Sequence, residues 1–192
     1  MHPLTWWSEV HGELAPVGYA LRSRYSENWI RFHSLPESKR YPESEREMQE
    51  LLRRAYVIAA ALFEEGEAVY IYKSHYYYES EGDAPPEYVQ IVDVPTEGKW
   101  ARLRANPGEI PVEDDDIFAT WAMEGVWPLP FFGELIRQVA VERERLVCIV
   151  SPGSGNMFCP YDGGMDIFTL SEGLQKSLSR FGSWRSQLES GL

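Results

Sequence analysis

Near the carboxyl end of the chain, two apolar runs are separated by a short polar stretch that contains glycine. An apolar run over 146–150 leads into Ser-Pro-Gly-Ser-Gly-Asn, and a second apolar run returns at 157–159. Two apolar runs around a glycine-containing loop are typical of a β-hairpin, in which glycine supplies positive φ. Centring this loop midway between the two runs places Cys148 opposite Cys159.

A second turn follows at 162–164, Asp-Gly-Gly. In such a turn an aspartate side chain bonds the local backbone and glycine takes the left-handed conformation. The turn leads into another apolar segment at 165–168, so this region predicts a three-stranded meander. A helix at 172–188, with a glutamate in its first turn, is expected to fold back on the meander.

Further strands are predicted elsewhere in the chain, two of them, 29–35 and 117–123, from alternation. Trp29, Arg31 and His33, for example, fall on one face of a short strand that ends before a proline. The segment 68–78 is rich in β-branched and aromatic residues, and we expect it to form a hairpin with 88–94 around an acidic loop. The predicted strands outside the meander are 29–35, 68–78, 88–94, 100–104 and 117–123.

The clearest helix lies at 44–65. Ser44, with Glu47 three residues later, forms a capping box, and apolar residues then recur at helical spacing. Gly66 is expected to end this helix. A further helix at 131–143 follows two prolines and has its own apolar stripe.

These elements predict a single α+β domain over residues 1–192, with a mostly antiparallel sheet packed against about three helices. Residues 1–28 are expected to dock on it as an N-terminal segment through aromatic side chains. With 44% hydrophobic and 14% aromatic residues, the chain can build a core and does not have the composition of a disordered protein.

The formal net charge of −12 narrows the classes of partner. Duplex nucleic acid is not expected, because phosphate binding needs clustered lysine and arginine. The charge favours a basic protein partner, although an acidic surface that serves only solubility is the plainer interpretation. Acidic loops with neighbouring aromatic anchors would form the binding surface. The residues expected to bind the partner are Glu79, Glu81, Asp83, Glu113, Asp114, Asp115, Asp116, Tyr76, Tyr78 and Trp100.

The amino-terminal residues have neither the basic region nor the apolar core of a secretory signal. No stretch approaches the ~20 apolar residues that span a bilayer. We therefore expect a cytoplasmic protein that does not bind membranes and in which Cys148 and Cys159 stay reduced. Two cysteines are too few for a structural zinc site.

The sequence contains no recognisable catalytic constellation, and we expect neither a metal nor a cofactor. Its histidines lack metal-ligand spacing, and it has neither a nucleophile elbow nor a phosphate-binding loop. His33 and His75 lie on predicted strands and could meet across the sheet. With Asp162 and Asp166 they define the alternative hypothesis, a small hydrolytic or metal-dependent enzyme. The two aspartates are more simply explained as turn formers, because two carboxylates under-fill the shell of a hard cation.

Three stretches resemble a known family. They are Trp29-Ile-Arg-Phe-His-Ser-Leu-Pro-Glu-Ser-Lys-Arg-Tyr41, the helix after it, and Pro160-Tyr-Asp-Gly-Gly-Met-Asp166 with the tryptophan-containing helix that follows. Over about residues 28–188 the chain resembles a bacterial family of small cytoplasmic proteins that share a domain of unknown function. The resemblance implies a fold and a bacterial origin but no site. By analogy, small acidic bacterial α+β proteins are often immunity proteins that neutralise a toxin. The leading hypothesis is a non-enzymatic, acidic protein-binding domain, most specifically an immunity protein for a basic toxin or effector.

Overall fold

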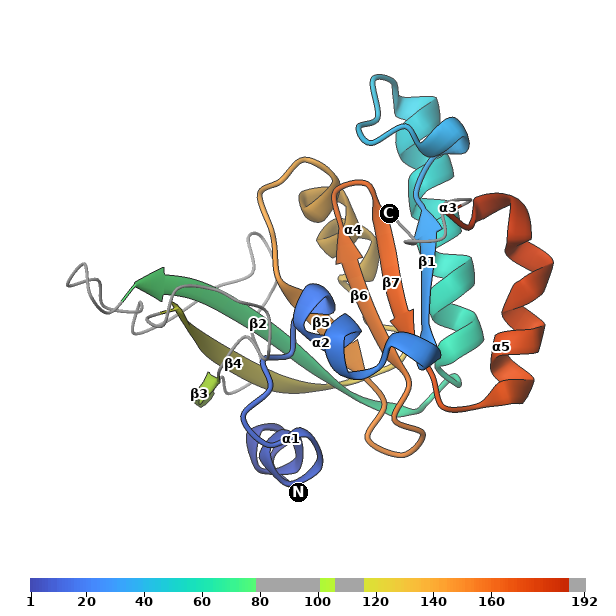
Figure 1. Cartoon of the computed structure of the whole chain (residues 1–192). Coiled ribbons are helices and arrows are strands. Elements are labelled where there is room, and N and C mark those ends of the chain that lie inside the picture. Colours follow the sequence, from blue (N-terminus) through green and yellow to red (C-terminus); the bar gives the residue numbers. More distant parts are fainter. Residues whose placement is uncertain (79–100, 106–115, 187–192) are drawn as a thin grey trace.

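The computed structural model describes residues 1–78, 101–105 and 116–186. In this part of the chain, seven strands form one antiparallel sheet in the order β1-β7-β6-β5-β2-β4-β3 (Figure 1). The strands are β1 Trp29–His33, β2 Ala68–Tyr78, β3 Ala101–Ala105, β4 Asp116–Val126, β5 Val147–Val150, β6 Met157–Tyr161 and β7 Gly164–Phe168. The predicted α+β class and antiparallel sheet are confirmed.

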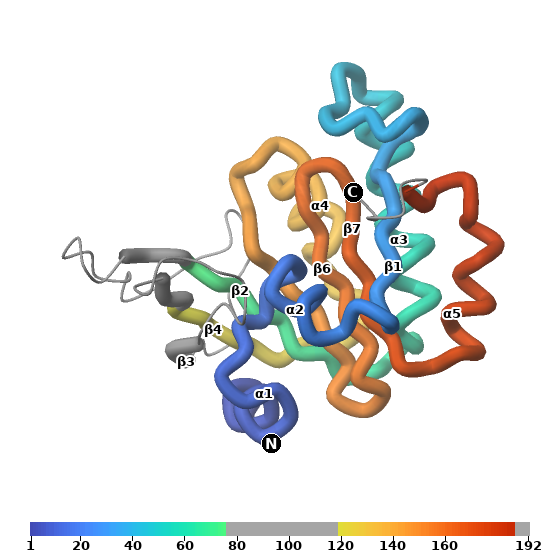
Figure 2. The backbone as a smooth tube through the Cα atoms, in the orientation of Figure 1, coloured from blue at the N-terminus to red at the C-terminus, as the bar shows by residue number. Residues whose placement is uncertain are grey.

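Five α-helices lie on the sheet in the described ranges, two more than expected. They are α1 Pro3–His11, α2 Gly18–Arg24, α3 Glu45–Leu62, α4 Phe132–Ala140 and α5 Glu172–Leu178. The three predicted helices, α3, α4 and α5, share one face, while α1 and α2 cover the other (Figure 2). The N-terminal segment therefore builds a second helical layer.

The predicted meander forms with the predicted register. Ile149 pairs with Phe158 and Val150 with Met157, so the same register continues to Cys148 opposite Cys159. Both cysteines are buried free thiols. Gly155 in the first loop has φ +73°, as expected of a glycine in this hairpin.

The second turn needs glycine for a different reason from the one expected. Tyr161 pairs with Gly164, so the β6–β7 loop contains two residues. Gly164 does not have positive φ; instead, a Cβ atom there would lie 2.2 Å from the carbonyl oxygen of Phe32 on β1. Glycine at this position lets β1 approach β7 closely.

Helix α3 begins as predicted and ends early. The Ser44 hydroxyl accepts a hydrogen bond from the Glu47 backbone nitrogen at 3.3 Å, which satisfies one open donor of the first turn. The helix ends at Leu62, because Phe63 is extended and places its ring in the core. Gly66, with φ +83°, belongs to the turn before β2 rather than to the helix end.

The sheet separates two apolar layers, and β2 shows the division most directly. Val69 and Ile71 face α3 and α4, whereas Tyr70 and Tyr72 face α1 and α2. Successive side chains of a strand point to opposite faces, and on β2 the side chains of both faces are buried. The partners of β2 are β4 along its whole length and β5 over part of it. The segment 88–94, expected to pair with 68–78, lies outside the described residues.

Candidate functional site

The predicted partner-binding surface falls on parts of the chain beyond the described side chains. Seven of its residues lie outside the described ranges: Glu79, Glu81, Asp83, Trp100, Glu113, Asp114 and Asp115. The side chains of Tyr76, Tyr78 and Asp116 also lie outside the described residues, although their backbone belongs to β2 and β4. Because Tyr78 pairs with Asp116, the segments that follow β2 and precede β4 are attached to the same end of this ribbon (Figure 1).

His33 and His75, which the alternative hypothesis brought together across the sheet, do not meet. His33 pairs with Gly164 at one edge of the sheet, and His75 pairs with Ala119. Strands β7, β6 and β5 lie between them. At about 4.8 Å per strand spacing, roughly 19 Å separates their backbones. Within the described ranges, no three His, Cys, Asp or Glu side chains are arranged to hold a metal ion.

Asp162 and Asp166 have different roles. Asp162 occupies the β6–β7 turn, as expected. Asp166 lies within β7 rather than in a turn and is only 3% exposed, so its interpretation as a turn former is wrong. Its Cα partner on β1 is Arg31, and the two side chains meet on the face of the sheet that α2 covers.

The Asp166 carboxylate is held by two residues of β1. Trp29 Nε1 and Arg31 Nε each donate to Oδ1 at 2.8 Å, and Arg31 Nη2 donates to Oδ2 at 3.0 Å. Burial works against the Arg31 cation, yet the hydrogen bonds to Asp166 leave the Arg31 pKa above its usual value. In this pair the guanidinium and the carboxylate satisfy each other's charge and hydrogen-bonding groups.

A second arginine approaches the same carboxylate without bonding to it. Arg22 of α2 places Nε 4.0 Å from Asp166 Oδ2, beyond hydrogen-bond distance, and this Nε is buried without a hydrogen-bond partner. Burial, and then the nearby Arg31 cation, lower the pKa of Arg22. The guanidinium carbons of both arginines lie 5.2 Å from the centre of the Trp29 ring.

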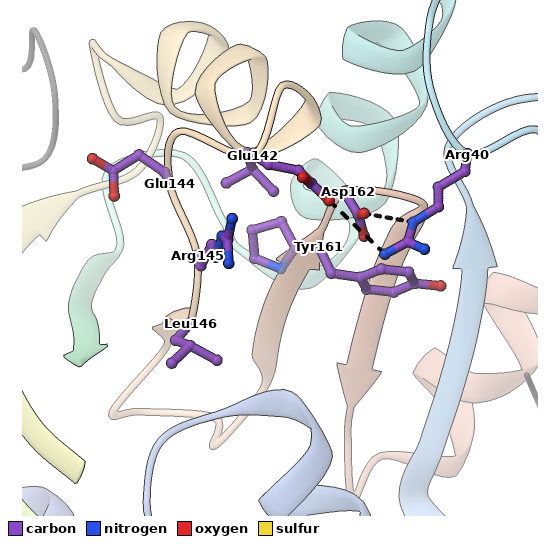
Figure 3. Close-up of a pocket in the computed structure, with 9 residues that line it drawn as sticks. Arg40, Glu142, Glu144, Arg145, Leu146, Tyr161 and Asp162 are labelled. Atoms are coloured by element: carbon purple, nitrogen blue, oxygen red, sulfur yellow. Dashed lines mark hydrogen bonds and ion pairs between the residues drawn. The ribbon is translucent and has the colours of Figure 1, made fainter. Parts of the chain in front are cut away.

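Two of the pockets that Tyr161 lines contain charged side chains. The first, here called the Arg22 pocket, has a volume of about 210 Å³ and is lined by Arg22, Arg31 and Asp166. The second, here called the Arg145 pocket, has a volume of about 220 Å³ (Figure 3). They share Leu146, Pro160 and Tyr161 as lining residues. Burial is the main cause that raises the pKa of Tyr161 to about 12, so its hydroxyl stays protonated at neutral pH.

The Arg145 pocket is bordered by paired charges. Arg40 Nε donates to Asp162 Oδ2 at 2.5 Å, and Arg40 Nη2 lies 4.0 Å from Glu142, whose carboxylate is next to that of Asp162 (Figure 3). Arg145 faces them across the pocket (Figure 3). The loop that supplies Glu142 and Arg145 is strained, since Glu142 and Leu146 have φ of 58° and 54° without being glycine.

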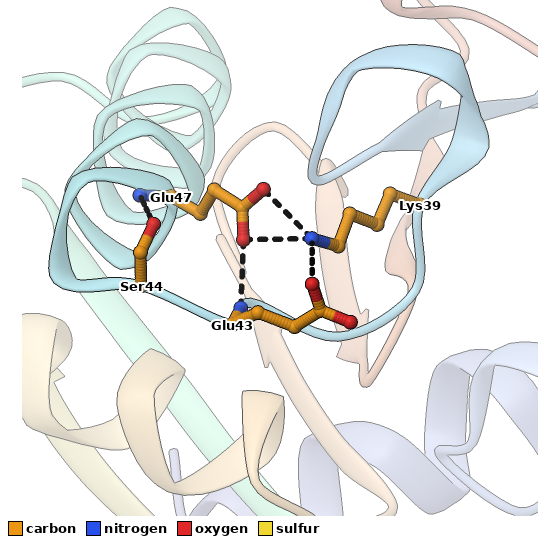
Figure 4. A network of polar contacts seen from close by, with 4 residues as sticks. All are labelled: Lys39, Glu43, Ser44 and Glu47. Carbon is orange, nitrogen blue, oxygen red and sulfur yellow. Dashed lines mark hydrogen bonds and ion pairs between the residues drawn. The ribbon is translucent and has the colours of Figure 1, made fainter.

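A third polar group lies before α3 and has a structural explanation. Lys39 Nζ donates to Glu43 at 2.9 Å and to Glu47 at 2.7 Å, while Glu47 also accepts from the Glu43 backbone nitrogen (Figure 4). These contacts fix the chain that enters the helix at the Ser44 cap. Exposed ion pairs of this type contribute little stability and provide no chemistry.

The residues that the sequence analysis missed are Arg22 and Arg31. The strand pattern could have drawn attention to Arg31, because an arginine on the same strand face as Trp29 has to be either exposed or paired. No signal in the sequence connects it to Asp166, which lies 135 positions away. Nor does the sequence bring Arg22 to the same point, since α2 was expected only as part of a docked segment.

The described chain is thus an α+β protein whose antiparallel sheet lies between two helical layers, with an arginine-lined pocket beneath the N-terminal layer. The family described as a domain of unknown function, DUF3885, matches residues 17–189, and the chain therefore belongs to that family. The match includes α2 and every described element after it, so it contains both pockets. No curated protein and no solved structure matches the chain. Among the described helices, none combines the length and apolar character needed to cross a membrane.

Proposed function

We propose that this chain is a non-enzymatic domain that binds a basic protein. In its most specific form it is a bacterial, cytoplasmic immunity protein that neutralises a basic toxin or effector. The proposal concerns the end of the β2–β4 ribbon and not the two pockets.

The observation that supports it is the uneven distribution of charge along the chain. The segments 79–100 and 106–115 contain ten acidic side chains and a single basic one, Lys99. The described ranges contain 19 acidic and 17 basic side chains and are close to neutral. Both acidic segments connect to the neighbouring ends of β2 and β4. Concentrated charge of one sign accelerates association with an oppositely charged partner and orients it.

The alternative enzyme hypothesis required a site formed by His33, His75, Asp162 and Asp166. The sheet separates the two histidines, and Asp162 and Asp166 are each bonded to an arginine. No contact among the described residues favours that site.

A paired charge-neutralising experiment tests the proposal. In one variant Glu113, Asp114, Asp115 and Asp116 are replaced by the corresponding amides. The matched control replaces four exposed glutamates of the described ranges by glutamine. These are Glu9, Glu27, Glu64 and Glu65. Each protein is used to capture partners from the native host at low and at high salt, and the association rate of any stoichiometric partner is then measured.

We expect a basic partner whose association with the first variant is at least about tenfold slower than with the wild type, and whose rate falls with salt. The control should behave as the wild type does. Absence of a stoichiometric partner at both salt concentrations, or equal rates for the two variants, would contradict the proposal.

A further inference from the structure

The Arg22 pocket combines features that the fold does not require. It is lined by residues of β1, β6 and β7, by α2, and by the start of β5 with the residue before it. The pocket stays open although the surrounding layer is closely packed: a Cβ atom added to Gly18 on α2 would lie 3.2 Å from Asp166 and 3.3 Å from Cys159. An open volume at such a closely packed junction is a candidate ligand site.

The charges in this pocket do not balance. Asp166 is the acidic residue that lines it, against two arginines. Arg31 already engages both carboxylate oxygens. Arg22 has no hydrogen bond, and its described contacts are the ion pair at 4.0 Å and the Trp29 ring. One guanidinium therefore lacks a hydrogen-bonded anion, in a protein of net charge −12.

Burial makes this imbalance significant. The Arg22 side chain is only 26% exposed, so water replaces the missing partner incompletely. The lowered pKa of Arg22 has the same cause. A guanidinium offers parallel N–H groups whose geometry matches a carboxylate or a phosphate.

The size of the pocket limits the ligand. A volume of about 210 Å³ is below the range of roughly 300–1,000 Å³ that is typical of drug-sized ligands. The pocket itself therefore holds a group of a few heavy atoms. The ring of Tyr161 closes one side, and its protonated hydroxyl adds no negative charge.

We propose that the Arg22 pocket binds a small oxyanion, either inorganic phosphate or a small carboxylate, through the guanidinium of Arg22. Arg31 and Asp166 position the site without contributing net charge, and Trp29 supports both guanidinium groups. The residues that line this pocket include none from the acidic segments of the proposed protein-binding surface, so failure of either proposal leaves the other standing.

Isothermal titration of the full chain with sodium phosphate, and separately with sodium acetate, tests the proposal at constant ionic strength. We expect one of the two anions to bind at a single site with a dissociation constant between about micromolar and millimolar, as befits so small a ligand. Arg22→Gln should weaken binding at least about tenfold. Arg22→Lys keeps the charge but loses the planar fork. Its affinity for the anion should lie between the affinities of the wild type and of Arg22→Gln.

Arg143→Gln is the matched control, because it removes one positive charge from an exposed arginine that lines neither pocket. Circular dichroism verifies that each variant is folded. Binding of phosphate alone assigns the site to phosphate, and binding of acetate alone assigns it to carboxylates. If neither anion binds, or if Arg22→Gln and Arg143→Gln bind equally, the proposal is overturned.

Discussion

The two faces of the sheet are built in different ways. The face under α3, α4 and α5 is mainly aliphatic, with Leu51, Ile58, Leu135 and Ile149 among its most deeply buried residues. The face under α1 and α2 contains large aromatic rings, two thiols and a pocket with charged walls. Amphipathic helices account for the first face, because apolar periodicity alone is enough to direct them to a sheet. The second face depends on polar groups that find partners far away in the sequence.

The largest loss of stability should come from removing Asp166, the buried carboxylate of the second face. Asp166→Ala leaves Arg31, whose side chain is 10% exposed, without its acidic partner. Breaking a buried pair from one side costs about 3–5 kcal/mol, and we expect a loss of this size in the free energy of unfolding measured with urea.

Asp162→Ala is the matched control, four positions earlier. Its partner Arg40 is 62% exposed, so the expected loss is about 1 kcal/mol or less. If Asp166→Ala fails to fold, the double variant Arg31→Met with Asp166→Leu should recover much of the stability, since the more deeply buried Arg31 charge is removed together with its partner. Equal losses for the two aspartate variants would contradict the difference that we infer between them.

The second face should also make the stability of the protein depend on pH. His11 is 4% exposed, its Nδ1 lies 2.8 Å from the Tyr25 hydroxyl, and its ring packs against Trp7. Burial, and then the Arg24 cation, lower its pKa from 6.5 to about 4. The folded protein therefore binds this proton less readily than the unfolded chain does. The stability from neutral His11 is complete above about pH 6.5 and is lost as the pH falls towards about 4.

This loss amounts to about 3 kcal/mol at 1.36 kcal/mol per pKa unit. Urea unfolding of the wild type and of His11→Gln between pH 4.5 and 7, roughly the interval over which the group titrates, measures it. The variant should show a smaller dependence of stability on pH. Identical slopes for the two proteins would exclude His11 as the cause.

The smallest effect should come from a shortened side chain on the aliphatic face. Ile58 on α3 is fully buried, and Ile58→Val removes one methylene from its environment. We expect a loss of about 0.5–1.5 kcal/mol. The loss should be the same at pH 7 and pH 5, because no titratable group takes part in this contact. A loss that changes with pH would show that the two faces are coupled.

Local patterns in the sequence were sufficient for most of the individual elements. Alternation identified β1, and the content of β-branched and aromatic residues identified β2. The Ser44 cap placed the start of α3, and the loop between β5 and β6 gave the register that brings Cys148 opposite Cys159. These features depend on residues close together in the chain, for which steric and capping rules are strong. The helix end at Leu62 was missed because burial of Phe63 outweighed the signal from Gly66.

The order of the strands and the content of the Arg22 pocket could not be obtained in this way. His33 and His75 each lie on a predicted strand, yet nothing local indicates that three strands separate them. Asp166 looked like part of a turn because Asp162 and two glycines precede it, and its true partners lie on β1 and α2. Periodicity along one segment specifies which side chains face inward, whereas the choice of neighbour across the sheet depends on packing and charge pairing over the whole domain.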